Sequence, residues 1–295
     1  MAQSLVSPCV GVCKIDSATG YCLGCARTGD EIASWRSGSE VYRQSVSRVL
    51  PARFRKLGLT THRLPWTANR IRTFVRRKIE QAEGTWVLGV VGAVGEFARD
   101  ADEAVDIVET ETSLEAVTPR AALRLHFGDE VRALAVGAGE LEESAKRIVL
   151  AVPKTTLRLP VAAALAALGP DADFIRGDAR EARLYDFGLG RAAARFCVRT
   201  GDAGLIAMLD AACGLSWSHV LHELGPELIE RSPTRVIETA LGRVEIDTQI
   251  PPPGGASPCG PHTHFLPDYL ALDRDMPVGM EIAEVYAPGA IFYSN

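Results

Sequence analysis

The chain has 295 residues, of which 47% are hydrophobic and 23% are charged, and its formal net charge is −5. This composition is typical of a folded globular protein and excludes a disordered chain. The most apolar run, at residues 161–168, is too short to cross a bilayer, and no basic stretch followed by an apolar run predicts a signal peptide. We therefore expect a cytoplasmic protein with no membrane partner.

Charge is distributed unevenly along the sequence. Residues 1–80 contain 14 lysines and arginines against 5 acidic residues, whereas the rest contains 18 against 32. A basic N-terminal part predicts either an anionic or protein partner for that part, or its docking onto the acidic remainder. The basic side chains that would contact a partner are Arg43, Arg48, Arg53, Arg55, Lys56, Arg76, Arg77 and Lys78.

The N-terminal region is predicted to be a small head, residues 1–58, made of a cysteine-rich segment and helices. Thr28 is a candidate N-cap for a short helix with Glu31 in its first turn. A second helix is predicted to follow and to break at Pro51, because proline lacks a backbone N–H. Residues 59–66 are expected to be a linker.

The remainder, residues 67–295, is predicted to be an α+β body. Residues 67–83 have the apolar spacing of an amphipathic helix. Gly89, Gly92 and Gly95 lie three apart, which favours close packing of a helix or strand against a neighbour rather than phosphate binding.

Secondary structure in the body is expected to divide into strands and helices. Five β-rich runs between residues 104 and 153 predict an antiparallel meander, and residues 235–250 predict a hairpin. Helices are predicted at residues 161–168, 174–183, 203–213 and 217–229. The fold class expected is α+β, with a mainly antiparallel sheet behind a small four-cysteine head.

Four cysteines form the most specific pattern in the sequence. Cys9, Cys13, Cys22 and Cys25 have the spacing C-x3-C-x8-C-x2-C. Two close pairs joined by a short loop can supply four thiolates to one tetrahedral site. Zinc would give a small head folding energy, and an iron–sulfur cluster also takes four cysteines, so both cofactors stay open. In a reducing compartment such a cluster is typical of metal or redox sites rather than disulfides.

This segment resembles the domain-of-unknown-function family 1289 over about residues 7–55. The resemblance implies a bound metal or an iron–sulfur cluster, the latter being predicted for that family, and implies no reaction. The matching positions are Ser7, Pro8, Cys9, Cys13, Asp16, Gly20, Cys22, Gly24, Cys25, Arg27, Thr28, Glu31, Ile32 and Trp35.

Histidines near the C-terminus suggest a second metal site. His262 and His264 alternate, so both imidazoles point the same way in an extended segment, and Asp268 follows. Two histidines and a carboxylate form several non-haem iron and zinc sites. The alternative is a rigid, proline-rich loop whose histidines bond to backbone. His219 and His222 lack the order of a zinc-protease helix and are expected to be ordinary helix residues.

The segment around these histidines, IPPP-x-G-x-SP-x-GPHTH-x-LP, and GAVGEF at residues 92–97 resemble uncharacterised alphaproteobacterial proteins over residues 65–295. That resemblance implies no chemistry.

The leading hypothesis is a cytoplasmic metalloprotein, a redox enzyme or an accessory protein whose head passes electrons to the body. The alternative is a zinc-stapled binding module for nucleic acid or a protein partner. In a third hypothesis the metal is only structural and the body binds a small ligand.

Overall fold

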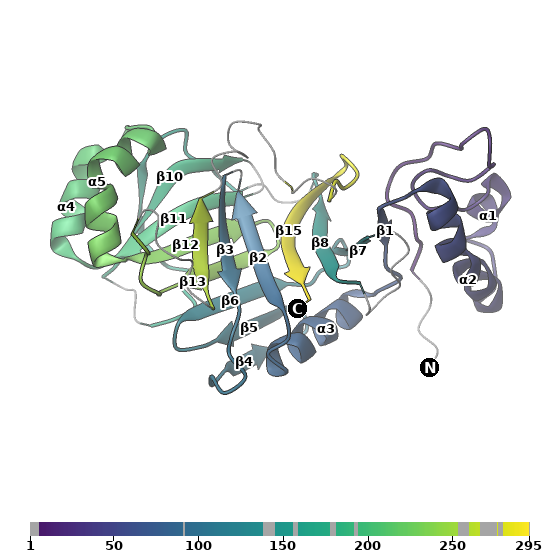
Figure 1. The fold of residues 1–295 in the computed structure, drawn as a ribbon, viewed down its shortest axis with the longest axis horizontal. Coiled ribbons are helices and arrows are strands. Elements are labelled where there is room, and N and C mark those ends of the chain that lie inside the picture. The colour runs from purple at the N-terminus through teal and green to yellow at the C-terminus, as the bar shows by residue number, and fades with distance from the viewer. Residues whose placement is uncertain are drawn as a thin grey trace.

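The computed structural model describes residues 6–90, 92–137, 145–155, 159–177, 181–191, 194–252, 260–265, 276 and 280–294. Within these ranges the body consists of two antiparallel sheets packed face to face, and the head lies at one end of it (Figure 1). The α+β class is therefore confirmed. No helix in the described part of the chain is long and apolar enough to span a membrane.

The first helix of the head, α1 (Gly29–Ser34), begins at the predicted cap. The Thr28 hydroxyl accepts the Glu31 N–H at 3.2 Å, and the Glu31 carboxylate accepts the Thr28 N–H at 2.9 Å. This reciprocal pair satisfies two amide groups that a helix start leaves without partners. Arg53 binds the same carboxylate at 2.6 and 3.0 Å and so joins the second helix to the first.

The second helix of the head, α2 (Glu40–Leu57), runs through Pro51, so the predicted break is wrong. Its buried residues are Val46, Leu50 and Phe54, four apart, which form one continuous apolar face on both sides of the proline. A proline removes one helical hydrogen bond, and packing of this face against Ala26 and Trp35 maintains the helix.

The two edge strands of the first sheet lie next to the two candidate sites. In the described residues it has seven strands: β1 (Thr61–Arg63), β2 (Thr85–Val90), β3 (Ala93–Phe97), β7 (Arg132–Val136), β8 (Arg147–Pro153), β14 (His262–Phe265) and β15 (Tyr286–Tyr293). Their order is β1-β7-β8-β15-β2-β3-β14. The expected linker at residues 59–66 thus contains an edge strand, and Leu64 and Trp66 beyond it are buried in the main core.

The second sheet packs against the inner face of the first. Its eight strands among the described residues are β4 (Asp106–Glu109), β5 (Ser113–Val117), β6 (Ala121–His126), β9 (Ala166–Pro170), β10 (Arg183–Arg191), β11 (Ala194–Thr200), β12 (Thr234–Thr239) and β13 (Gly242–Ile246). Their order is β4-β5-β6-β13-β12-β11-β10-β9. All five strands expected between residues 104 and 153 exist, but only the first three form a meander here, because β7 and β8 belong to the first sheet.

Three predicted helices are confirmed: α3 (Ala68–Glu80), α4 (Ala203–Ala212) and α5 (Trp217–Arg231). Figure 1 shows α4 and α5 at the end of the body opposite the head. Two other predictions are wrong, because residues 166–170 form β9 and the described part of residues 174–183 contains no helix. In these segments backbone N–H groups donate hydrogen bonds to buried carboxylates of the second sheet instead of to helical carbonyls. Ala162 N–H donates to Asp186, and Ile175 N–H donates to Glu245.

Gly95 of β3 allows the two sheets to approach closely. A Cβ atom at this position would lie 2.7 Å from Ile237 Cδ1 and 3.0 Å from Val244 Cγ1 of the second sheet. We expect Gly95→Val to lower the free energy of unfolding by about 1–3 kcal/mol through overpacking, as measured by urea denaturation. Gly201→Val, at a position with nothing within 4 Å, is the control and should change it by less than about 0.5 kcal/mol. Equal effects of the two variants would contradict this account.

The head contacts the body through apolar side chains at β1. His62, 3% exposed, stacks on Phe54 of α2 with ring centroids 4.6 Å apart. Val10, 7% exposed, packs into the apolar layer on the outer face of the first sheet. Arg63 donates to the Cys9 carbonyl at 3.3 Å. The cysteine segment therefore lies directly against the body.

Candidate metal centres

The cysteine segment folds back on itself and brings its two pairs to the same end of the head. Ile15 and Cys22 form an antiparallel bridge across the turn at residues 16–20. Cys22 and Cys25 are buried, Cys9 is half-buried and Cys13 is exposed. The site therefore has an inner side within the head and an outer side toward solvent.

Three of the four sulfurs each accept one hydrogen bond. Each donor lies two residues after its cysteine: Gly11 N–H to Cys9 Sγ at 3.3 Å, Gly24 N–H to Cys22 Sγ at 3.4 Å, and Arg27 Nε to Cys25 Sγ at 3.4 Å. Donors of this kind stabilise thiolates, and in iron–sulfur proteins they tune the reduction potential.

Neighbouring sulfurs and burial oppose the ionisation of two thiols in the segment. The pKa of the Cys13 thiol is raised above its ordinary value, first by the negative charge of Cys9, then by burial and by the charge of Cys22. Burial is the main cause that raises the pKa of Cys25, and Arg27 opposes it. A bound cation would reverse this effect, since a coordinated thiol is deprotonated.

The sulfurs are near one another without forming a closed tetrahedron. Four thiolates 2.3 Å from a zinc ion would lie about 3.8 Å apart. Among the described residues, the four cysteines do not form a group whose ligand atoms all lie within 4.8 Å. The structure thus brings the predicted ligands together more loosely than a zinc ion would hold them.

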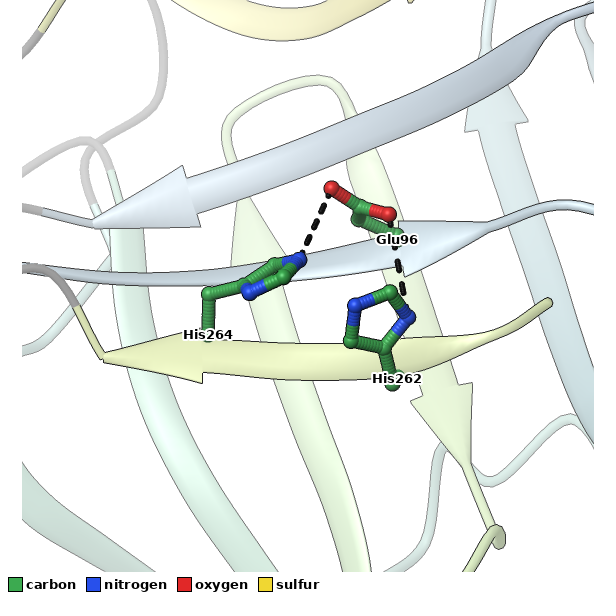
Figure 2. A group of neighbouring side chains, drawn as sticks. All are labelled: Glu96, His262 and His264. Atoms are coloured by element: carbon green, nitrogen blue, oxygen red, sulfur yellow. Dashed lines mark hydrogen bonds and ion pairs between the residues drawn. The ribbon is translucent and has the colours of Figure 1, made fainter. Parts of the chain in front are cut away.

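Such a compact group does occur in the body, where Glu96, His262 and His264 have ligand atoms all within 4.8 Å of one another. Figure 2 shows the three side chains pointing toward one another from two neighbouring strands, β3 and β14. His262 is the cross-strand partner of Glu96, and His264, two residues on, lies on the same face. The predicted HxH geometry is therefore present in a strand at the sheet edge.

Distances within this group are short. His264 Nε2 lies 3.1 Å from Glu96 Oε1, and His262 Nδ1 lies 3.7 Å from Glu96 Oε2. His262 Nδ1 also donates to the Gly260 carbonyl at 2.7 Å, which leaves its Nε2 buried with no hydrogen-bond partner in the described structure. The two rings are 4.1 Å apart.

Asp268, the carboxylate proposed from sequence, lies outside the described residues, and the carboxylate that the structure places beside the histidines is Glu96. Sequence reasoning missed Glu96. The signal that could have found it is in GAVGEF, where Glu96 is a charged residue in an otherwise apolar strand. The other histidine pair, His219 and His222, is exposed on α5, where His219 Nδ1 lies 2.7 Å from Ser216 Oγ.

The histidine site lies at the β14 edge of the first sheet, and the cysteine segment lies beside the opposite edge strand, β1. One row of cross-strand partners runs from the histidine site to the cysteine segment: His262, Glu96, Val87, Ile291, Val149, Leu134 and Arg63. Six strand spacings of ~4.8 Å separate its ends by roughly 29 Å. Two ions bound at these sites would not share a ligand.

Much of the predicted basic surface is engaged within the chain. Arg53 pairs with Glu31, Arg76 with Glu80 and Glu109, and Lys78 with Glu83. Arg48, Arg55 and Lys56 of α2 remain exposed. The part of the surface that could receive an anionic partner is therefore smaller than the sequence suggested.

Comparison with known proteins identifies two segments. The model of a protein of unknown function, DUF1289, matches residues 7–54, which contain the four cysteines. The model of a family of unknown function, DUF6925, matches residues 70–295. No curated protein and no solved structure matches the chain. The clustered cysteines of the first segment indicate a metal-binding role, and through the second, which spans most of its length, the chain belongs to the DUF6925 family.

Proposed function

We propose that this protein is a redox metalloprotein whose head binds an iron–sulfur cluster through Cys9, Cys13, Cys22 and Cys25. The observation that carries the proposal is the set of hydrogen-bond donors on three of the four sulfurs.

The cluster would supply one-electron transfer, and the residues around it would set its charge and access. Arg27, beside Cys25, and Arg63, beside Cys9, bring positive charge to a site of four thiolates. Cys13 is exposed, so one side of the site faces solvent, where an electron could be exchanged with another molecule.

A zinc-stapled binding module is the second candidate. Exposed Arg48, Arg55 and Lys56 on α2 support an anionic partner such as nucleic acid. Binding through phosphates would weaken steeply with salt. If the protein bound neither duplex nor single-stranded nucleic acid at any salt concentration, this candidate would be excluded.

The test is metal and sulfide analysis of anaerobically purified protein, with visible absorption. We expect iron and sulfide together with sulfur-to-iron charge-transfer bands. Cys22→Ser should lower the bound iron at least tenfold, since even indirect supporting contacts cost 10–100-fold in affinity, roughly. Cys213→Ser, an exposed thiol beside α4, is the control and should retain the iron. Stoichiometric zinc without these bands would overturn the redox proposal.

A further inference from the structure

We infer that Glu96, His262 and His264 bind a single divalent transition-metal ion. This site is independent of the four cysteines, because it lies at the opposite edge of the sheet. Its ligands come from β3 and β14, so the inference holds whatever the head binds.

Strand register creates the site. Directly opposed residues of an antiparallel pair have Cβ atoms about 5 Å apart, and the diagonal neighbour is within reach of long side chains. Glu96 and His262 are directly opposed, and His264 is the diagonal neighbour on the same face. The three ligands are therefore held by the sheet ladder, which fixes side chains more firmly than a loop does.

Hydrogen bonding selects the nitrogen of His262 that would bind the ion. A carbonyl only accepts, so the bond at 2.7 Å to Gly260 O requires the proton on Nδ1. The lone pair is then on Nε2, which is buried and has no hydrogen-bond partner among the described residues. Metal-binding histidines donate their other ring N–H to a carbonyl or carboxylate in this way.

The spacing of the other two ligands fits one ion. Two ligand atoms about 2.1 Å from an ion, at angles between 90° and the tetrahedral value, lie about 3.0–3.4 Å apart. His264 Nε2 and Glu96 Oε1 lie 3.1 Å apart. In the metal-free protein the Nε2 proton of His264 occupies this contact, and the ion would take its place and release one proton.

A purely structural role explains less of the geometry. A cross-strand Glu–His pair would account for the bond between Glu96 and His264. It would leave the Nε2 lone pair of His262, in a side chain 8% exposed, buried without a partner, which costs the desolvation of that atom with no compensating bond. A metal ion satisfies that atom and both other ligands together.

Two imidazoles and one carboxylate determine the class of ion. This ligand set suits iron(II), manganese(II) or zinc(II), whereas magnesium and calcium prefer oxygen ligands alone. Three protein ligands leave coordination positions open for water or an oxygen-donor substrate, as in catalytic sites. The side chains of His264 and Glu96 are 31% and 26% exposed, so the open positions are accessible from solvent.

Cobalt(II) is the probe for the test, because its d–d absorption reports the ligand set and sulfur ligation adds an intense charge-transfer band. We expect the full-length protein, with its cysteine site already filled, to bind one further cobalt(II) without sulfur charge transfer and with release of about one proton. Glu96→Gln and His264→Gln should each weaken this binding by about 100-fold or more, because they remove a ligand.

Thr263→Val is the matched control, since it lies between the histidines and faces the other side of the sheet. It should bind cobalt(II) as the wild type does.

Circular dichroism without metal checks that each variant is folded, and His264→Gln, at a half-exposed edge position, keeps the test valid if Glu96→Gln does not fold. The Cys9→Ser, Cys13→Ser double variant should still bind at this site, which separates the inference from the proposal for the head. The inference would be overturned if the wild type bound no further ion, or if Glu96→Gln and His264→Gln bound cobalt(II) as tightly as the wild type does.

Discussion

Replacing Arg243 with methionine should lower the free energy of unfolding by about 3–5 kcal/mol, because it leaves buried carboxylates without their shared partner. Arg243 is 3% exposed on β13. Its guanidinium pairs with Asp171, with Glu238 at 2.9 Å and with Glu245 at 2.8 Å. These carboxylates are themselves nearly inaccessible to solvent, so water cannot replace the lost contacts.

Urea denaturation measures this effect, and Arg183→Met is the matched control. Arg183 also pairs with a carboxylate, Asp210, but their side chains are 48% and 42% exposed. A surface pair of this kind contributes about 0–1 kcal/mol. If both arginine variants were destabilised by the same small amount, the buried network would not contribute to stability as its geometry indicates.

Acid should destabilise the protein through His62, by about 3 kcal/mol between pH 6.5 and pH 4. Burial lowers the pKa of His62 from 6.5 to about 4, and neither ring nitrogen has a hydrogen-bond partner in the described structure. The folded state thus favours the neutral ring. This contribution to stability is fully present above pH 6.5 and is lost as the pH falls toward 4, because the unfolded chain takes up the proton first.

The measurement compares wild type with His62→Leu across this range, since carboxylates also titrate there. The difference in unfolding free energy should move in favour of the variant by about 3 kcal/mol on going from pH 7 to pH 4. A difference that is constant with pH would show that the ring is not held neutral against Phe54.

Local patterns in the sequence predicted the parts of the fold that depend on local interactions. Alternating apolar residues gave the strands from β4 to β8, and Thr28 with Glu31 gave the start of α1. The alanine-rich residues 161–168 have high helix propensity but form no helix, because residues that follow much later in the chain determine their hydrogen bonds. Tertiary contacts override propensity there.

The two candidate sites differ in how far apart their residues lie in the sequence. The four cysteines lie within 17 residues, so their spacing alone identifies them as one group. Glu96 is 168 residues from His264 and reaches it only through the pairing of β3 with β14. No local spacing rule connects residues that far apart. β13 is a similar case, since its alternating charged residues suggest an exposed face although every residue in it is buried.

The position of β1 has a practical consequence for isolating the body. A fragment that began at residue 70, where the DUF6925 match begins, would omit this strand and expose the edge of β7. It would also omit Leu64 and Trp66, each 2% exposed in the main core, and the Trp66 ring lies 4.9 Å from that of Phe74. A fragment of the body therefore has to begin near residue 59. Even then it would present His62 to water where Phe54 covers it in the intact chain.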